Sequence, residues 1–258
     1  MNRRPAPPCN LQGLNVLVTR PAEQAAEFSE LISAAHGRPV GFPALEILGP
    51  EDKHAVRRQL GALDRLDLLI FVSANAVRYA FPLLPDQIPL DLRIAAVGRA
   101  TGRALEAVGL EPTLVPDASF DSEGLLALPA LQHIEGWQIL IVRGNGGRPL
   151  LGDTLRARGA QVDYAEVYRR RLPQRNPANL IANWERLVDV VTVTSVQILD
   201  NLFTLLGEAG SERLRATPLV VASERIAREA ADRGCEQVLV APSALDRDML
   251  ATLCGLVD

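Results

Sequence analysis

Asp67-Leu-Leu-Ile-Phe-Val-Ser-Ala-Asn-Ala-Val-Arg-Tyr-Ala-Phe81 decides the fold, because it returns later in the chain as Asp189-Val-Val-Thr-Val-Thr-Ser-Val-Gln-Ile-Leu-Asp-Asn-Leu-Phe203. Two further pairs of segments match at nearly the same separation: Gly13–Arg20 with Gly136–Arg143, and Arg93–Gly98 with Pro218–Ser223. A repeat of this length gives each copy the size of a small domain, which is too long for the unit of a solenoid. The sequence therefore predicts two similar domains.

The composition is that of a globular protein with aliphatic cores. Of the 258 residues, 48% are hydrophobic but only 4% are aromatic, so Leu, Val, Ile and Ala must fill the cores. Lys53 is the only lysine, so anionic groups can be met only by arginines, helix N-termini and neutral donors. The net charge is −4, and no basic run with interleaved aromatic residues occurs, which argues against nucleic-acid binding.

The sequence carries no sign of a membrane, a secretion route or a metal. No apolar run is long enough to span a bilayer, and residues 1–12 lack the apolar core of a secretion signal, so we expect a cytoplasmic protein with no membrane partner. The cysteines Cys9, Cys235 and Cys254 are widely spaced and form no CxxC motif, so we expect neither a disulfide framework nor a zinc site. No HxxxH, HExxH or paired-carboxylate spacing predicts a metal site of another kind.

Short runs of β-branched residues alternate with amphipathic helices along the chain. This alternation is typical of α/β domains with parallel sheets. The predicted strands are Leu14–Thr19, Leu68–Val72, Arg93–Val97, Thr113–Val115, Gln138–Val142, Val188–Val193, Leu219–Val221 and Gln237–Val240.

Two extended segments, Arg38–Leu48 and Ala160–Leu172, interrupt this alternation at equivalent positions of the repeat. If each carries the chain from one domain to the other, domain one comprises residues 1–38 and 173–258, and domain two comprises residues 39–172. The crossings, near residues 39–48 and 160–172, would then pair antiparallel as a two-stranded ladder. Periodicity alone also allows an ordinary tandem of two halves that divides near Glu135.

The residues that directly follow the predicted strands are small, hydroxylated, glycine or arginine. Ligands of parallel α/β sheets bind at this end of the strands. The segments are Thr19-Arg20-Pro21, Ser73-Ala74-Asn75, Gly98–Thr101, Arg143–Gly147, Thr194-Ser195-Val196 and Ser223-Glu224-Arg225. Helices begin directly after them, so several helix N-termini could together hold a polyanionic ligand. The alternative is that each Ser, Thr or Asn serves only as a helix N-cap.

The loop Arg143-Gly-Asn-Gly-Gly147 could also be a phosphate loop. It lacks the Lys-Ser/Thr pair of a P-loop and the GxGxxG spacing, so a tight strand-to-helix turn near an anion explains it better. No pattern of a nucleophilic triad is found in the sequence. An enzyme built from these residues would work mainly through shape and the placement of charge.

Four of these segments together resemble the uroporphyrinogen-III synthase family. They are Thr19-Arg20-Pro21, Ile70-Phe-Val-Ser-Ala-Asn-Ala-Val77, Ala95-Ala-Val-Gly-Arg-Ala-Thr101 and Val167-Tyr168-Arg169. Their order and spacing fit the family from about Leu14 to Leu253. The resemblance implies two α/β domains joined by a two-stranded β ladder, with the first domain discontinuous.

The resemblance also implies a reaction. Members of the family are lyases of tetrapyrrole (haem and porphyrin) biosynthesis that close hydroxymethylbilane to uroporphyrinogen III, with inversion of the D ring and release of water. The family mechanism is thought to pass through an azafulvene and a spiro intermediate, without a metal or an organic cofactor. The eight carboxylates of the substrate fit the arginines and helix N-termini at the strand ends.

Individual residues also match the family. Tyr168 falls on the tyrosine that is the usual candidate to assist departure of the hydroxyl, since a phenol can donate a proton at neutral pH. Its alternative role is packing at the hinge. Thr101 and Ser73 match family residues, although Val72 replaces the usual Thr beside Ser73. Ser223 stands where the family usually has Gly, and Glu224-Arg225 depart from its Thr-rich turn.

The resulting hypothesis has one catalytic residue, Tyr168, and a set of substrate-binding residues at the strand ends. That set is Arg20, Ser73, Asn75, Gly98, Thr101, Arg143, Gly144, Asn145, Thr194, Ser195 and Ser223. We expect a monomer with transient contact to the upstream bilane synthase. Two rivals remain open: a non-catalytic two-lobed binding protein for small molecules, and a nucleotide-dependent enzyme that uses Arg143–Gly147.

Overall fold

The two copies of the repeated sequence form equivalent strand-to-helix steps. In the first copy, strand β4 (Leu68–Phe71) leads through Ser73 into helix α3 (Ala74–Ala80). In the second copy, β8 (Val190–Val193) leads through Ser195 into α9 (Val196–Ala216), which is interrupted at Gly207. Each strand is fully buried, and each serine caps the helix that follows it. The two copies are therefore similar in structure as well as in sequence.

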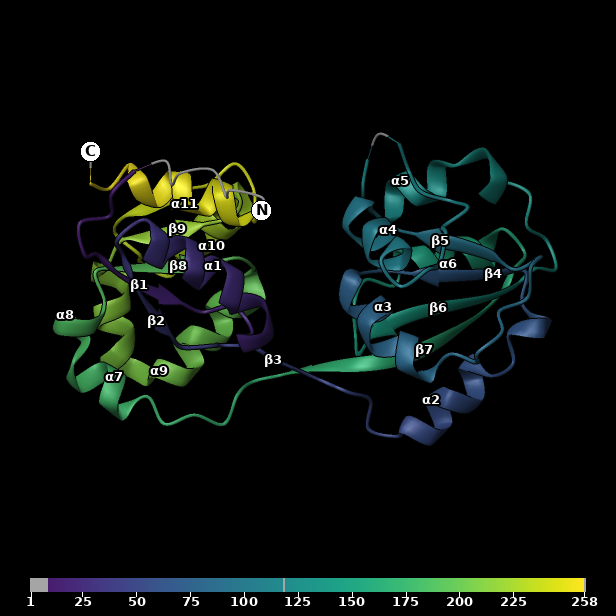
Figure 1. Cartoon of the computed structure of the whole chain (residues 1–258), viewed down its shortest axis with the longest axis horizontal. Coiled ribbons are helices and arrows are strands. Elements are labelled where there is room, and N and C mark those ends of the chain that lie inside the picture. Colours follow the sequence, from purple (N-terminus) through teal and green to yellow (C-terminus); the bar gives the residue numbers. More distant parts are fainter. Residues whose placement is uncertain (1–8, 118, 258) are drawn as a thin grey trace. The chain divides into compact units, whose positions relative to one another are not determined.

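The computed structural model describes residues 9–117 and 119–257. Ile47–Arg170 form one compact unit, called unit 2 here, and the chain on either side of this segment forms unit 1. Each unit contains a five-stranded sheet (Figure 1). The fold class predicted from the sequence, two similar α/β domains with parallel sheets, is confirmed.

The sheet of unit 1 joins strands from both ends of the chain. Its strands, in spatial order, are β10 (Val238–Val240), β9 (Leu219–Val221), β8, β1 (Asn15–Val18) and β2 (Arg38–Gly41). All four neighbouring pairs are parallel. Because β1 pairs with β8, Val16 lies beside Val190 although the two residues are far apart in sequence.

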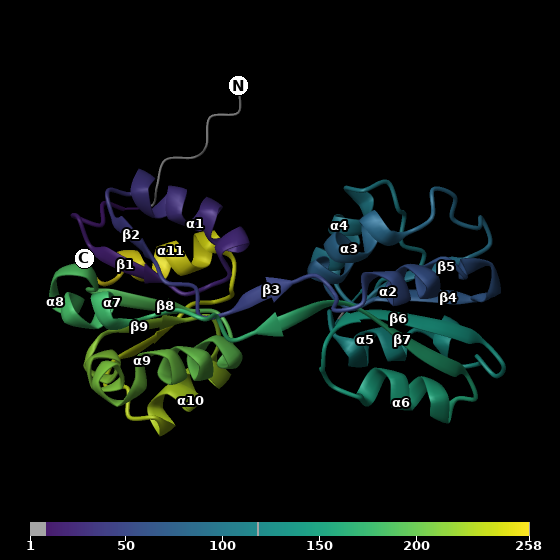
Figure 2. The same ribbon diagram turned by 90° about the horizontal axis from the view of Figure 1, so that it is seen from below.

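Helices cover both faces of this sheet (Figure 2). One face packs against α1 (Ala22–Ala34) and α11 (Asp246–Cys254) through an aliphatic core. The other face packs against four helices: α7 (Ala178–Ala182), α8 (Trp184–Leu187), α9 and α10 (Glu224–Asp232).

The sheet of unit 2 repeats the same strand order. Its strands are β3 (Glu46–Leu48), β7 (Gln161–Arg171), β6 (Gln138–Gly144), β4 and β5 (Arg93–Ala96). The series β7-β6-β4-β5 corresponds to β2-β1-β8-β9 of unit 1, and its neighbours are all parallel.

Two groups of helices enclose the sheet of unit 2 (Figure 2). The helices α2 (Lys53–Leu60), α3 and α4 (Arg99–Glu106) bury one face. The helices α5 (Ser122–Ala127) and α6 (Leu150–Ala157) bury the other. Single 3₁₀ turns lie at Leu63–Arg65, Phe81–Leu83 and Pro129–Leu131.

The structure corrects the interpretation of the two extended segments. Arg38–Gly41, expected in the crossover, forms β2 and pairs parallel with β1. Pro39 lacks an N–H group, but an edge strand tolerates proline, and β2 is an edge. The second segment is also mostly an ordinary strand, because β7 pairs parallel with β6. Within the two segments, β3 lies beside β7 in the sheet.

Two smaller expectations were also wrong. Thr113–Val115 is not a strand, since only Leu114 forms an isolated bridge, to Ala95. No disulfide was expected, yet Cys9 is bonded to Cys254, with their Cα atoms 5.8 Å apart. The pairing follows from the packing of α11 on the β1 face, which brings the far end of the chain beside the segment that precedes β1. Cys235 is a buried free thiol. Within residues 9–117 and 119–257, every helix is too short or too polar to cross a membrane.

Candidate functional site

A β-bulge at the end of β7 sets the direction of the Tyr168 side chain. Glu166 lies opposite Arg143 of β6, but the next paired residues are Tyr168 and Gly144, so Val167 is extra. Side chains alternate between the faces of a regular strand, whereas a bulge breaks the alternation and redirects a side chain. As a result Val167 and Tyr168, although adjacent, both pack into the core beneath α2, α3 and α4.

The Tyr168 ring lies directly against the backbone of Gly144. A Cβ atom at Gly144 would lie 2.5 Å from both Cε2 and Cζ of the ring. Tyr168 is only 2% exposed, and its ring centroid is 5.9 Å from that of Tyr79. The ring therefore has little room to yield, and Gly144 is the residue that allows it to occupy this place.

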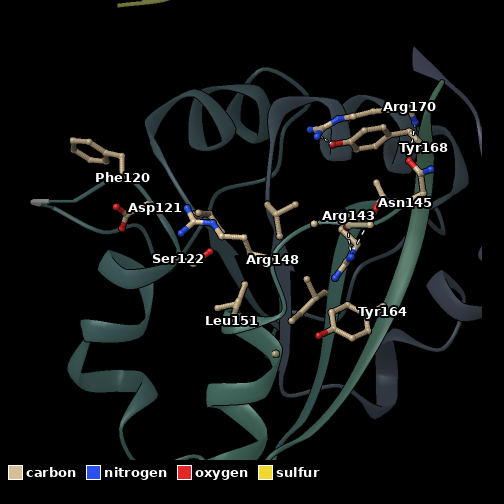
Figure 3. A pocket seen from close by; sticks show the side chains of 17 residues that line it. Phe120, Asp121, Ser122, Arg143, Asn145, Arg148, Leu151, Tyr164, Tyr168 and Arg170 are labelled. Atoms are coloured by element: carbon tan, nitrogen blue, oxygen red, sulfur yellow. Dashed lines mark hydrogen bonds between the residues drawn. The ribbon is translucent and has the colours of Figure 1, made fainter. Parts of the chain in front are cut away.

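Two side chains, those of Ser73 and Arg170, hold the Tyr168 hydroxyl, and Figure 3 shows the one from Arg170. Its oxygen is 3.2 Å from Ser73 Oγ and 3.3 Å from Nη2 of Arg170. Ser73 is the N-cap of α3, and its Oγ accepts a hydrogen bond from the N–H of Ala76 at 3.1 Å. Two sequence-predicted site residues, Ser73 and Tyr168, are thus brought into direct contact.

Asn145 fastens the end of β7 beside the glycine loop. Its backbone N–H donates to the carbonyl oxygen of Tyr168 at 2.9 Å. Its side-chain oxygen accepts from the N–H of Arg170 at 2.7 Å. These bonds fix the backbone on both sides of Arg169, so Asn145 shapes the site through the main chain of β7.

A cavity of about 400 Å³ opens next to this cluster, at the carboxyl ends of β4, β5 and β6. This volume is within the range of small-molecule sites. It is lined by Val72, Val97, Phe120, Asp121, Ser122, Ile141, Arg143, Gly144, Asn145, Gly146, Gly147, Arg148, Leu151, Gly152, Tyr164, Tyr168 and Arg170. Figure 3 shows Tyr168 and Arg170 on one wall and Phe120 to Ser122 on the opposite wall. The sequence-predicted residues Arg143, Gly144, Asn145 and Tyr168 all line this cavity.

The three arginines of the cavity have different partners. Arg143 turns back on its own loop: Nε donates to the carbonyl of Gly144 at 3.2 Å, and Nη2 donates to that of Gly146. Its guanidinium also lies over the Tyr164 ring, 4.7 Å from the centroid. Arg148 is exposed and pairs with a surface glutamate at 2.9 Å. Arg143 therefore braces the loop, while Arg148 and Arg170 are the cations that solvent can reach.

Aspartate and glycine shape the opposite wall. Asp121 is the N-cap of α5, and the hydroxyl of Ser119, with help from the N–H of Gly124, holds the pKa of its carboxyl below the usual value. Gly98 is the N-cap of α4, and a Cβ there would lie 3.1 Å from the carbonyl oxygen of Phe120. Gly98 thus permits the close approach of the loop that carries Phe120.

The remaining predicted residues of unit 2 do not line the cavity. Thr101 is 4% exposed and lies in the packed face of α4. Asn75 is half-buried in the first turn of α3.

Four predicted residues belong to unit 1, at the carboxyl ends of its strands. Arg20 is buried, forms an ion pair with Asp246, and lies over the Phe28 ring at 4.5 Å. Ser195 caps α9 by accepting the N–H of Ile198 at 3.2 Å. Ser223 stands at the N-cap of α10 without a side-chain bond to it, and Thr194, which follows β8, is half-buried. Arg20 differs from Arg148 and Arg170 in being buried, and its Nη2 atom has no hydrogen-bond partner among the described residues.

Sequence reasoning missed Arg170, Arg148, Tyr164 and Phe120. A signal for Arg170 was present, because residues i and i+2 of a strand share a face and Arg170 follows Tyr168 by two positions. Arg148 and Phe120 depend on how the loops fold over the end of the sheet, whereas Tyr164 lies in β7, and no spacing in the sequence marks any of the three.

Comparison with known proteins agrees with this fold. The family model described as uroporphyrinogen-III synthase HemD matches residues 26–251. The uroporphyrinogen-III synthase of Escherichia coli K12 is 36% identical over 249 residues, covering 92% of this chain and 98% of its own. The corresponding protein of Salmonella typhimurium LT2 is 35% identical, over 92% of this chain and 98% of its own.

Solved structures share the fold. A mutant uroporphyrinogen III synthase from Thermus thermophilus matches with a TM-score of 0.62 and 22% identity, covering 92% of this chain and 96% of that one. The Helicobacter pylori enzyme matches with a TM-score of 0.62 and 13% identity, covering 94% and 99%. The match of the family model over most of the sequence, together with relatives more than one third identical over nearly their full length, shows that this chain belongs to the uroporphyrinogen-III synthase family.

Proposed function

We propose that unit 2 binds the reacting end of linear hydroxymethylbilane in the cavity beside Tyr168, and that Tyr168 assists the closure of this substrate to uroporphyrinogen III. Membership of the family supports the overall reaction. The observation that carries the proposal for the site is the Tyr168 hydroxyl, which stands beside two polar side chains at the wall of a cavity of about 400 Å³.

The chemistry asked of Tyr168 is one proton transfer. The bond between the hydroxymethyl carbon and its oxygen breaks, and the oxygen leaves with the electron pair. It takes the phenolic proton of Tyr168 and departs as water, while the positive charge left behind spreads over the pyrrole ring. Ring closure then releases a proton from the attacked pyrrole, and this proton restores the phenol. General acid assistance of this kind contributes about 10²–10⁴-fold to a rate, and a substrate that loses its hydroxyl readily needs the lower end.

Binding the substrate is assigned to cations and backbone groups around the cavity. Arg148 exposes its guanidinium group, which suits carboxylates because a guanidinium can donate two parallel hydrogen bonds. Arg143 acts indirectly, by holding the carbonyl groups of Gly144 and Gly146 and so fixing the shape of the loop. Holding a flexible chain in the geometry for closure is itself a large part of catalysis.

Incubation with freshly prepared hydroxymethylbilane tests the proposed function. The enzyme should produce the type III isomer faster than the spontaneous reaction produces type I. A binding protein without activity would protect or sequester the bilane and leave the isomer ratio to the spontaneous reaction. That result would contradict the proposal, and the two isomers are separable after oxidation to porphyrins.

We also propose that the enzyme works as a monomer in the cytoplasm and receives its substrate through transient contact with the upstream bilane synthase. The family resemblance supports this setting, since the bilane is unstable and its rapid transfer limits spontaneous closure. Light scattering of the purified chain tests the monomer. A dependence of the type III yield on added bilane synthase, at equal bilane supply, tests the contact.

A further inference from the structure

We propose that Arg170 is a positioning residue, which orients the Tyr168 proton toward the cavity and stabilises the phenolate that remains when the proton leaves. This inference rests on the proposed function of Tyr168 as the acid. It is carried by the hydrogen bond from Nη2 of Arg170 to the Tyr168 oxygen at 3.3 Å, and by the placement of the guanidinium 5.7 Å from the ring centroid.

The direction of the bonds around the Tyr168 oxygen follows from the donors present. A guanidinium group has only donors, so the Tyr168 oxygen must accept from Arg170. Ser73 Oγ accepts from the N–H of Ala76 and keeps both its own proton and a second lone pair, so either hydroxyl can donate in its 3.2 Å bond with Tyr168, and we take Ser73 as the donor. With both neighbours donating, the Tyr168 proton is left to point away from them. The Tyr168 side chain is part of the cavity wall, so we infer that this proton faces the space assigned to the substrate.

The same arrangement serves the state after proton transfer. The Tyr168 oxygen then carries a negative charge, and the bond from Arg170, which the cationic donor already assists, becomes a bond between opposite charges with added Coulomb attraction. The bond therefore strengthens as the carbon–oxygen bond of the substrate breaks. An interaction that is stronger late in the reaction lowers the barrier, whereas one of constant strength does not.

The fold fixes Arg170 from its backbone. Arg170 lies two residues beyond Tyr168 in β7, so the two side chains leave the strand on the same side. The side chain of Asn145 accepts the N–H of Arg170 at 2.7 Å and holds this part of the strand in place. The Arg170 side chain itself is exposed, so its removal should cost little stability.

A double-mutant cycle between Arg170→Ala and Tyr168→Phe tests the inference. If Arg170 acts through the phenol, Arg170→Ala should lower kcat by about 10-fold in the wild-type background and have no further effect on kcat in the Tyr168→Phe enzyme. Arg170→Lys, which keeps a cationic donor, should recover part of the loss. The matched control is Arg169→Gln, because Arg169 is the neighbouring arginine and pairs with the exposed Glu51 instead; its kcat should match that of the wild type.

The outcomes are separable from those of the proposed function. Formation of type III product by the wild-type enzyme is measured first and decides the function alone. Multiplicative losses of kcat in the double variant would overturn the role of Arg170, since they would mean that it acts on the substrate independently of Tyr168. An unchanged kcat for Arg170→Ala would overturn it as well, and so would a loss of kcat in proportion to a lowered Tm.

Discussion

The ring of Tyr168 lies so close to the backbone of Gly144 that a Cβ atom on Gly144 would lie 2.5 Å from two ring carbons. Real side chains essentially never approach so closely, and Tyr168 is buried, so the ring could not move aside without disturbing its neighbours. The contact exists because the bulge in β7 places Tyr168 opposite Gly144. Gly144 thus belongs to the site by leaving space for its central residue.

Substitution Gly144→Ala should displace the Tyr168 ring and lower both kcat and stability. Overpacking of this kind typically costs about 1–3 kcal/mol. Thermal unfolding and steady-state kinetics measure the two effects. The control is Gly49→Ala, because a Cβ at Gly49 meets nothing within 4 Å. If Gly144→Ala kept the wild-type kcat and Tm, the packing described for the Tyr168 ring against Gly144 would be wrong.

The ion pair between Arg20 and Asp246 leads to a different expectation for unit 1. Their side chains are 9% and 21% exposed, so Arg20→Ala leaves a poorly hydrated carboxylate and should lower the free energy of unfolding by about 3 kcal/mol. Arg213→Ala, at an exposed pair with Glu185, should cost under about 1 kcal/mol. Denaturant unfolding checks both. A rise in KM for Arg20→Ala with no loss of stability would instead support direct binding of a substrate carboxylate.

The bond between Cys9 and Cys254 should make stability depend on redox conditions. It closes a loop that spans most of the chain, and disulfides stabilise by about 2–4 kcal/mol. The oxidised wild type should therefore melt above Cys9→Ser, and a reductant should remove the difference. Cys235→Ala should respond to reductant like the wild type. An equal Tm for wild type and Cys9→Ser without reductant would contradict the bond between Cys9 and Cys254.

Burial raises the pKa of the Cys235 thiol, so the native oxidised protein should react slowly with alkylating agents at neutral pH.

Asp52, the N-cap of α2, should make the stability of the fold sensitive to acid. The N–H of Ala55 donates to the Asp52 carboxylate at 2.8 Å and, as the largest cause, holds the pKa of Asp52 below its usual value of 3.8. A lowered folded-state pKa means that this stabilisation is present above pH 3.8 and is lost as the pH falls through the folded value. Asp52→Asn keeps a capping oxygen but cannot titrate, so it should lose less stability than the wild type between about pH 6 and pH 3. Urea unfolding at both values measures the difference, and equal losses would argue against it.

Much of the architecture could be predicted from the repeat. The strand-to-helix steps at Ser73 and Ser195 follow from the burial of the apolar runs before them and from the capping preference of serine. The edge strand β2 could not be predicted from local pattern, because Pro39 reads as a break unless the neighbouring strand is known. The bond between Cys9 and Cys254 depends on how α11 packs, which cysteine spacing does not reveal.

Part of the site was predictable because ligands of parallel sheets bind at the carboxyl ends of the strands. Strand ends gather residues such as Arg143, Gly144 and Asn145, and these do line the cavity of unit 2. Sequence does not show whether a polar group there faces a ligand or its own backbone, as Arg143 does. The orientation of Tyr168 depends on a bulge, and strict alternation along β7 would have put its ring on the opposite face.

The central claim is that the Tyr168 hydroxyl gives its proton to the leaving oxygen of the substrate, and single-turnover kinetics of Tyr168→Phe with fresh hydroxymethylbilane tests it most directly. The matched control is Tyr79→Phe. Tyr79 packs beside Tyr168, but its hydroxyl donates to the carbonyl of Ile47, so this variant should lower the Tm and keep the rate. Tyr168→Phe should slow the reaction by about 10–100-fold at nearly unchanged KM, with a fall in Tm comparable to that of Tyr79→Phe, while the product remains type III. A Tyr168→Phe enzyme that turns over at the wild-type rate would contradict the account.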